Sequence, residues 1–259
     1  MRRRSRRPPF QRGAKRRRPN EQDPDSDFGL PLAGTILPPE SWTRTAVKKM
    51  PPPGWLNWQE LFGRTAPLVL DLGCGNGRFT IQSAWQRPEL DFFAIDTLPL
   101  VLRYATRRAN QRGLANVRFA AIDAEQLLRH YVSPQAASEI HLYHPQPYHD
   151  IAQAGKRMLT GTFLANVWRA LIPGGLFVLQ TDNRPYWNYV TQVLPLFFDW
   201  EMQSQPWPDA PQGRTRREIY SLKKGSPIYR AVCRPLSELS VESVQLLAAE
   251  VPPPDFRAS

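Results

Sequence analysis

The chain has 259 residues, of which 41% are hydrophobic and 11% aromatic, enough for one large domain with a buried core. Its formal net charge is +11, but residues 1–18 hold ten of the 34 Lys and Arg residues and no acidic residue, so the rest of the chain is nearly neutral. Two cysteines without a CxxC spacing argue against a disulfide framework or a metal site, and no apolar run approaches the ~20 residues of a membrane helix. We therefore expect a cytoplasmic protein without metal or membrane segment.

Three regions follow from the composition. Residues 1–40 are basic and proline-rich and are predicted to be a disordered tail, because few apolar side chains are available to offset the entropy of ordering. Such a tail would release counterions from RNA or DNA, although a solvated run that only aids solubility is the alternative. Residues 41–235 are predicted to form the folded domain. Residues 236–259 are a C-terminal extension with a short helix that stops before the prolines at 252–254.

From residue 67 onward, strand-like and helix-like segments alternate. The expected strands are 66–73, 91–96, 116–123, 137–144 and 174–182, and the expected helices are 77–86, 98–113, 124–132, 155–171 and 185–197. This alternation predicts an α/β fold, with a doubly wound, mainly parallel sheet covered by helices on both faces. In such sheets, ligands bind at the carboxyl ends of the strands.

The first strand ends in LDLGCGNG, which places Asp71 directly before Gly73, Gly75 and Gly77. Glycines allow a sharp turn and a close approach of the backbone to a ligand. The spacing is G-x-G-x-G, whereas a pyrophosphate-binding turn has G-x-G-x-x-G, and the Asp71 carboxylate would repel a pyrophosphate. A cofactor that carries an ammonium group fits this turn better, so a nicotinamide-dependent oxidoreductase is disfavoured.

The next two expected strands also end in aspartates. Asp96 is placed to accept hydrogen bonds from ribose hydroxyls, and Asp123 either meets an adenine amino group or caps the following helix. Together with Asp71 and the glycine turn, this pattern resembles S-adenosylmethionine-dependent methyltransferases. The resemblance implies a Rossmann-like class I fold and S-adenosyl-L-methionine as cofactor, with Asp71, Asp96 and Asp123 in contact with it.

After the fourth expected strand the chain reads HPQPYH, in which two prolines hold Gln146 in a rigid stretch of backbone. This stretch resembles the Phe-Pro-Asp-Pro-Trp-His segment of the bacterial tRNA (guanine-N7-)-methyltransferase family. Further similarities to that family are KRML at 156–159, TDNRPYW at 181–187 and TRRE at 215–218. We therefore expect a divergent member of this family.

The resemblance implies methyl transfer from S-adenosylmethionine to N7 of a guanine in tRNA, by a monomer. It assigns catalysis to Gln146 and Tyr148, with Gln146 also near the cofactor. The residues implied in binding the guanine or the tRNA are Asp150, Asp182, Thr215, Arg216, Arg217 and Glu218. Together with the tail, Arg214, Arg216 and Arg217 would contact phosphates of the tRNA.

Gln146 stands where the family has its functional aspartate, Tyr148 where it has tryptophan, and Asp150 where it has lysine. Guanine N7 is an unprotonated lone pair, so the reaction needs positioning and tolerance of a cationic product rather than a general base. An amide can accept from the guanine amino group or donate to O6. Two alternatives remain: a catalytically impaired protein that binds cofactor and RNA, and a methyltransferase for another RNA base or a small aromatic substrate.

Overall fold

An eight-stranded sheet forms the centre of the computed structural model, which describes residues 25–255, so the basic run 1–18 lies outside the described residues. The strand order is β3-β6-β5-β4-β7-β8-β10-β9, and only β10 runs against its neighbours. Its strands are β3 (Ala46–Val47), β4 (Leu68–Leu72), β5 (Asp91–Asp96), β6 (Val117–Ala121), β7 (Ala137–Tyr143), β8 (Leu171–Thr181), β9 (Phe198–Met202) and β10 (Tyr229–Pro235). The prediction of a mainly parallel sheet is confirmed.

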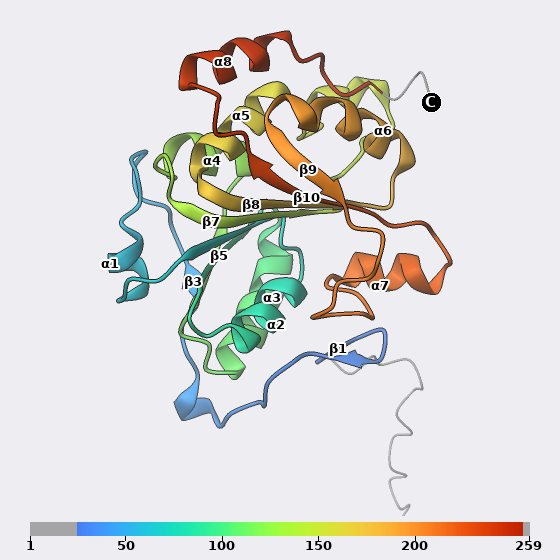
Figure 1. Cartoon of the computed structure of the whole chain (residues 1–259). Helices are drawn as coiled ribbons and strands as arrows, with labels where there is room; N and C mark the ends of the chain where they lie inside the picture. Colours follow the sequence, from blue (N-terminus) through green and yellow to red (C-terminus); the bar gives the residue numbers. More distant parts are fainter. Residues whose placement is uncertain (1–24, 256–259) are drawn as a thin grey trace, which may run out of the picture.

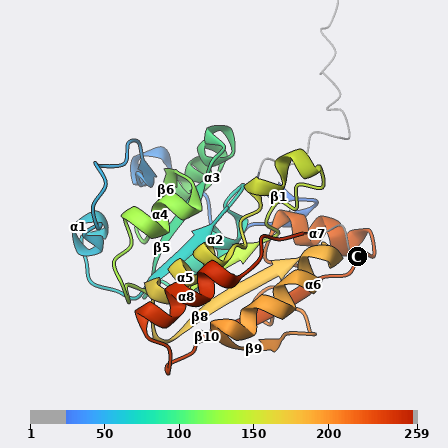
Figure 2. The ribbon, with the colours of Figure 1, turned by 90° about the horizontal axis from the view of Figure 1, so that it is seen from above.

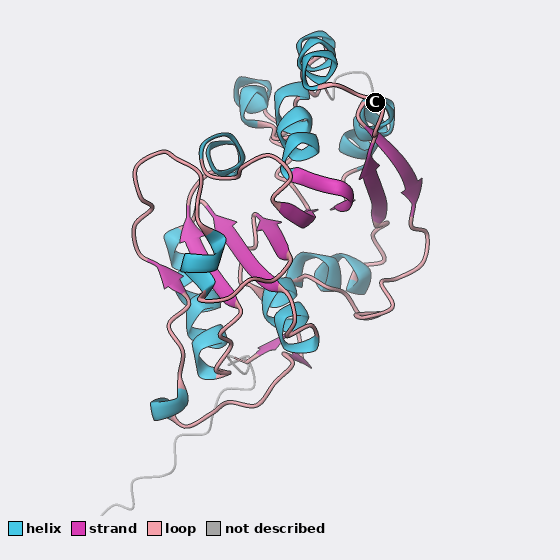
Figure 3. Cartoon of the chain, turned by 60° about the vertical axis from the view of Figure 1, so that its left-hand side comes forward, coloured by secondary structure: helices cyan, strands magenta, loops and turns pink. Residues whose placement is uncertain are grey.

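Helices cover both faces of the sheet (Figures 1 and 3). They are α1 (Trp58–Phe62), α2 (Arg78–Gln86), α3 (Pro99–Gln111), α4 (Ala124–His130), α5 (Gly161–Ala170), α6 (Arg184–Val193), α7 (Arg216–Lys223) and α8 (Val241–Glu250), with short 3-10 helices at Pro39–Ser41, Ile151–Lys156 and Leu194–Leu196. Figure 1 shows α4, α5, α6 and α8 on one side of the sheet and α2, α3 and α7 on the other. Among residues 25–255, no helix combines the length and the apolar character needed to cross a bilayer.

Side-chain alternation along the strands explains the two layers. In β4, Leu68, Leu70 and Leu72 join the core under α4 and α5, whereas Val69 joins the core under α2 and α3. Because strand side chains alternate between the faces, Asp71 points to the same side as Val69. A glycine turn and the start of α2 lie on that side, so the alternation delivers a carboxylate to the end of the sheet where ligands are expected.

The helix expected over 155–171 begins later than predicted. The segment forms a 3-10 helix at Ile151–Lys156 and then α5 from Gly161. The reason is local, because the Thr160 hydroxyl accepts a hydrogen bond from the Phe163 N–H at 3.1 Å and caps a new helix.

The predicted tail of residues 1–40 differs from the structure over residues 25–40, which pack against α2 and α3. A short hairpin, β1 (Ser26–Asp27) and β2 (Leu30–Pro31), places the Asp27 carboxylate within 3.2 Å of Arg78 and 3.4 Å of Arg108. Asp27 and Leu32 are buried. These contacts join residues far apart in sequence, and composition does not reveal them. The prediction that residues 25–40 belong to the tail, which rested on composition, was therefore wrong.

The described part of the C-terminal extension also packs on the domain. The predicted short helix is confirmed as α8, whose Val244 is buried and which lies along α5 in Figure 2. A Cβ added to Gly161 of α5 would lie 2.2 Å from the Ala248 carbonyl oxygen, so glycine allows the two helix backbones to approach closely.

Candidate active site

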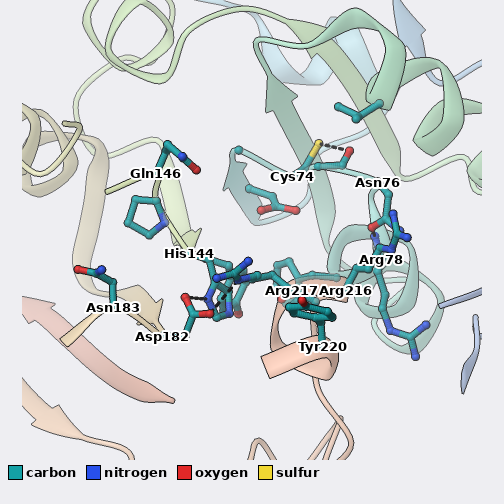
Figure 4. A pocket seen from close by; sticks show the side chains of 18 of the residues that line it. Cys74, Asn76, Arg78, His144, Gln146, Asp182, Asn183, Arg216, Arg217 and Tyr220 are labelled. Carbon is teal, nitrogen blue, oxygen red and sulfur yellow. Dashed lines mark hydrogen bonds and ion pairs between the residues drawn. The ribbon is translucent and has the colours of Figure 1, made fainter. Parts of the chain in front are cut away.

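A cavity of about 720 Å³ opens at the carboxyl ends of β4, β7 and β8 (Figure 4). Eight of the residues predicted for the site line it: Asp71, Gly73, Gly75, Gln146, Asp182, Thr215, Arg216 and Arg217. They come from the glycine turn, from the loop after β7, from the end of β8 and from the start of α7. The structure therefore brings the predicted cofactor side and the predicted substrate side to one cavity.

The glycine turn is held from behind by Asp96. Gly73 and Gly75 have φ values of +79° and +53°, which other residues rarely adopt. The Asp96 carboxylate accepts hydrogen bonds from the Gly75 N–H and from the Leu98 N–H, both at 2.9 Å. Asp96 is not part of the cavity wall, but it fixes the shape of the turn and keeps acceptor capacity on both oxygens.

Asp71 is a buried carboxylate at the floor of this turn, with 2% of its surface exposed. Burial raises the pKa of Asp71 to about 7; a hydrogen bond from the Thr80 hydroxyl lowers it, and the nearby Asp96 charge raises it. Near neutral pH the group is therefore close to its own titration point. A cation bound beside it would favour the ionised form.

The loop after β7 has a strained backbone on both sides of Gln146. His144 and Tyr148 have φ values of +52° and +44°, unusual for residues with a side chain. Strain of this kind persists only where surrounding contacts hold it, and it is concentrated at functional sites. Gln146 itself is exposed, and within residues 25–255 its amide has no hydrogen-bond partner, so it is available to a ligand.

Among the carboxylates that line the cavity, Asp182 accepts the most hydrogen bonds. One oxygen lies 3.2 Å from His144 Nδ1, and the other accepts from the Ser221 hydroxyl at 2.6 Å and from Arg217 Nε at 2.7 Å. Burial alone would raise the pKa of Asp182, but the hydrogen bonds from His144 and Ser221 outweigh it and hold that pKa well below its usual range. Asp182 is therefore a fixed negative charge at the cavity wall.

The amide of Gln180 determines which nitrogen of His144 carries the proton. Its oxygen accepts from Trp207 Nε1 at 2.6 Å and from Arg230 Nε at 3.1 Å, two groups that can only donate. The Gln180 NH₂ group must therefore face His144 Nε2, which lies 2.9 Å away and accepts. This arrangement assigns the proton of a neutral His144 to Nδ1, from which it is donated to Asp182.

Glu218, Asp123 and Asp150 are predicted site residues that do not belong to the cavity wall. Glu218 is 1% exposed and forms an ion pair with Arg230 at 2.7 Å. Asp123 caps α4 by accepting from two backbone N–H groups, and Asp150 caps the 3-10 helix that follows it. Burial and the ion pair leave Glu218 without access to a ligand, whereas the caps use only Oδ1 of Asp123 and of Asp150, so a ligand contact of these two residues stays a prediction.

Gly77 and Tyr148 also lie outside the wall. A Cβ on Gly77 would come within 2.7 Å of the Ala105 Cβ, so this glycine is required for packing of α2 on α3. The Tyr148 ring is half-buried, with Lys156 Nζ 6.0 Å from its centre.

The three arginines predicted to contact phosphates differ in their surroundings. Arg214 stacks on Trp207 at 4.0 Å and forms an ion pair with Asp209 at 2.6 Å. Arg216 and Arg217, by contrast, have side chains that are 53% and 58% exposed at the rim of the cavity. Of these three arginines, Arg216 and Arg217 therefore present exposed guanidinium surface to a bound polyanion, and Arg217 also donates from Nε to Asp182.

Sequence reasoning missed four aromatic residues of the cavity, which are Phe28, Phe79, Tyr143 and Tyr220. Phe28 and Tyr220 line it with ring centres 5.8 Å apart, and Arg216 lies 5.2 Å above the Phe28 ring. No sequence pattern indicated Phe28 as a site residue, because it lies in the segment that was predicted to belong to the disordered tail. His144, which also lines the cavity, could have been found from its place directly before Pro-Gln-Pro.

Two solved structures with a similar fold are named as methyltransferases. The 16S rRNA methyltransferase KamB superposes with a TM-score of 0.56 at 16% identity, covering 75% of this chain and 99% of that one. An antibiotic-related methyltransferase gives a TM-score of 0.51 at 18% identity, covering 69% and 92%. At these identities the likeness concerns the fold, and the predicted Rossmann-like class I fold is confirmed.

Sequence comparisons also identify methyltransferases as relatives of this chain. The family described as "Putative methyltransferase" matches residues 65–231, a range that includes the walls of the cavity other than Phe28. The tRNA (guanine-N(7)-)-methyltransferase of Halorhodospira halophila is 29% identical over 197 residues, which are 74% of this chain and 85% of that protein. That of Rubrobacter xylanophilus is 30% identical over 178 residues, 68% and 79% of the two chains. The chain therefore belongs to the tRNA (guanine-N(7)-)-methyltransferase family.

Proposed function

We propose that this protein transfers a methyl group from S-adenosylmethionine to N7 of a guanine in tRNA. One observation carries the proposal: a single cavity joins Asp71 and the glycine turn to Gln146 and Asp182. A methyl donor on the first side and a flat base on the second would meet within it. The names of the relatives in Halorhodospira and Rubrobacter support the same substrate.

The residues present fit this cofactor. A Cβ added to Gly73 or Gly75 would meet no atom within 4 Å, so the turn presents bare backbone to open space. Asp71 offers a negative charge for an ammonium group, and Asp96 retains acceptor capacity for ribose hydroxyls. When bound, S-adenosylmethionine supplies an electrophilic methyl group on a sulfonium.

On the substrate side, the residues of the chain orient the base and stabilise charge. No proton has to be removed from N7, so a general base is unnecessary. Asp182 has about four lone-pair positions, three of which are taken by His144, Ser221 and Arg217. One position remains for a guanine N–H, and the fixed negative charge stabilises the positive charge that develops on the base. The free amide of Gln146 is placed to hold the base in line.

The tRNA backbone is the proposed partner of the exposed arginines. Arg216 and Arg217 stand at the rim, where phosphates on either side of the target base would pass. The basic run 1–18 would add affinity that does not depend on sequence. The protein would act in the cytoplasm as a monomer.

A second candidate rests on Gln146, which stands where the family has its functional aspartate. A protein that binds cofactor and tRNA without transfer would show the same cavity. The test is incubation of unmodified tRNA with labelled S-adenosylmethionine, followed by mass spectrometry of the nucleosides. We expect label in 7-methylguanosine. Label in another nucleoside would mean that the enzyme methylates a different atom. If no label is found although the cofactor binds, the second candidate is favoured.

A further inference from the structure

The C-terminal segment that follows the family match ends beside the loop that forms one wall of the cavity. The match stops at residue 231, whereas α8 and the chain after it lie beyond that point. We propose that residues 251–255, here called the strap, hold the substrate loop (residues 144–150) in its shape through Arg157. Arg157 is then a positioning residue of the methyl transfer. The catalytic part of this inference rests on the proposed function.

The strap is anchored along its length. Val251 at its start and Pro254 near its end are both buried. Between them, the Tyr189 hydroxyl of α6 donates to the Pro252 carbonyl oxygen at 2.9 Å. Figure 1 shows the chain leaving α8 and running toward α6. With α8 fixed on α5 at Gly161, the strap has a defined course over the domain.

Arg157 joins the strap to the substrate loop. Its guanidinium donates from Nη1 to the Pro254 carbonyl oxygen at 2.5 Å, from Nε to that of Pro147 at 2.9 Å, and from Nη2 to that of Tyr148 at 2.9 Å. The residue is 5% exposed, so these bonds are shielded from water. A planar guanidinium has donors in a fixed fork, and one that is held at Pro254 can present the other donors to the loop in only one orientation.

The two loop carbonyls that Arg157 binds lie on either side of the strained residue. The carbonyls of Pro147 and Tyr148 belong to the peptides before and after the Tyr148 side chain, whose φ is +44°. This left-handed conformation is unfavourable for a residue with a side chain and requires external contacts to persist. Since Gln146, Pro147 and His149 line the cavity, the strap influences the wall that faces the substrate.

Cleavage by chymotrypsin after Tyr148 measures whether the strap holds the loop. Proteases bind extended backbone, so cleavage requires Tyr148 to leave its left-handed conformation. The variants are Tyr189→Phe, which removes only the hydroxyl at Pro252, and a chain that stops at Val251. We expect cleavage to become about threefold to tenfold faster in Tyr189→Phe and at least tenfold faster in the shortened chain.

The matched control is Tyr131→Phe. Tyr131 likewise donates its hydroxyl to a proline carbonyl, that of Pro51 at 3.0 Å, and neither residue lines the cavity. The Tyr131→Phe substitution should leave the rate of cleavage after Tyr148 unchanged. Equal cleavage in wild type, Tyr189→Phe and the shortened chain would overturn the inference. This readout needs no transfer activity, so it decides the role of the strap even if the wild type fails to methylate tRNA.

Kinetics then separate positioning from general stability. For Tyr189→Phe we expect kcat for tRNA methylation to fall about threefold while the Kd for S-adenosylmethionine stays unchanged, because the strap acts on the substrate wall. Arg157→Lys keeps the charge without the fork and should lower kcat further. Faster cleavage with unchanged kcat in both variants would show that the loop shape does not matter for the reaction and would overturn the positioning role.

Discussion

Arg230 donates a hydrogen bond to Glu218 at 2.7 Å, and both side chains are at most 4% exposed. The resemblance to the family placed Glu218 at the substrate, whereas the structure shows it as half of a buried ion pair. Removing one charge from such a pair leaves the other uncompensated, at a cost of about 3–5 kcal/mol.

Glu218→Gln should therefore lower the free energy of unfolding by about 3 kcal/mol or more, measured by urea denaturation. Arg217→Gln, on the same helix, removes a partly exposed ion pair with Asp182 and should change it by no more than about 1 kcal/mol. If Glu218→Gln kept its stability and lost only tRNA affinity, the residue would contact the substrate after all.

His144 should act through the proton that it donates to Asp182. His144→Phe removes that bond and leaves the Gln180 NH₂ group without its acceptor, so we expect kcat/KM for tRNA to fall roughly tenfold to a hundredfold. His144→Asn keeps a donor at the place of Nδ1 and should recover most of the activity. Equal losses in the two variants would contradict the assigned proton position.

Gln146 should affect the chemical step and not stability, because it is exposed and its amide has no partner within residues 25–255. Single-turnover methylation by Gln146→Ala should slow about tenfold, the lower end of the cost of losing an orienting contact. Gln146→Asp, which restores the residue found in the family, should be faster than wild type, because a carboxylate stabilises the cationic product better than an amide. An unchanged rate in Gln146→Ala would remove this residue from the mechanism.

Cofactor binding should depend on pH through Asp71. Its pKa is raised to about 7, so below that value the free protein holds a proton that a bound ammonium group would displace. We expect the Kd for S-adenosylmethionine to rise about tenfold for each pH unit below 7 and to be lowest between about 7 and 8, above which an α-amino group loses its own proton. Calorimetry in buffers of different ionisation enthalpy would detect the released proton. In Asp71→Asn, binding should be weaker and lack this slope.

The raised pKa of Asp71 also predicts how the free energy of unfolding changes with pH. A carboxyl group whose pKa is higher in the folded state binds more protons there, so its contribution to stability falls as pH rises from about 4 to about 7. At about 1.4 kcal/mol per pKa unit, the loss is roughly 4 kcal/mol. Asp71→Asn should remove this decline, and thermal unfolding of the cofactor-free protein at pH 7.5 should occur at a higher temperature. A lower unfolding temperature would mean that the ionised Asp71 stabilises the fold.

The basic run should contribute affinity for tRNA that depends on salt. Deleting residues 1–18 removes ten cationic side chains, so the slope of log K against log salt should become shallower. The single-turnover rate at saturating tRNA should stay unchanged, because the cavity is intact. An identical slope in filter-binding titrations would exclude the run from tRNA binding.

Much of the site could be read from local pattern. The short apolar run LVLDL indicated a strand with Asp71 near its end, and the glycines after it indicated a turn, because only glycine adopts those φ values readily. The prolines on either side of Gln146 likewise indicated a rigid loop. These features depend on near neighbours in the chain, so the sequence determined the sheet, the glycine turn and the location of the cavity.

The roles of individual polar residues were decided by tertiary structure. An aspartate after a strand can bind a ligand or cap a helix, and Asp123 caps α4 with one carboxylate oxygen, which leaves its contact with a ligand a prediction. Glu218 is buried in the fold because it forms an ion pair with Arg230 of β10. The left-handed backbone at Tyr148 is stabilised by hydrogen bonds from Arg157, which also binds the strap. The last two outcomes depend on partners further along the chain, Arg230 for Glu218 and Pro254 for Arg157, which local propensity and spacing cannot specify, because only the folded chain brings them together.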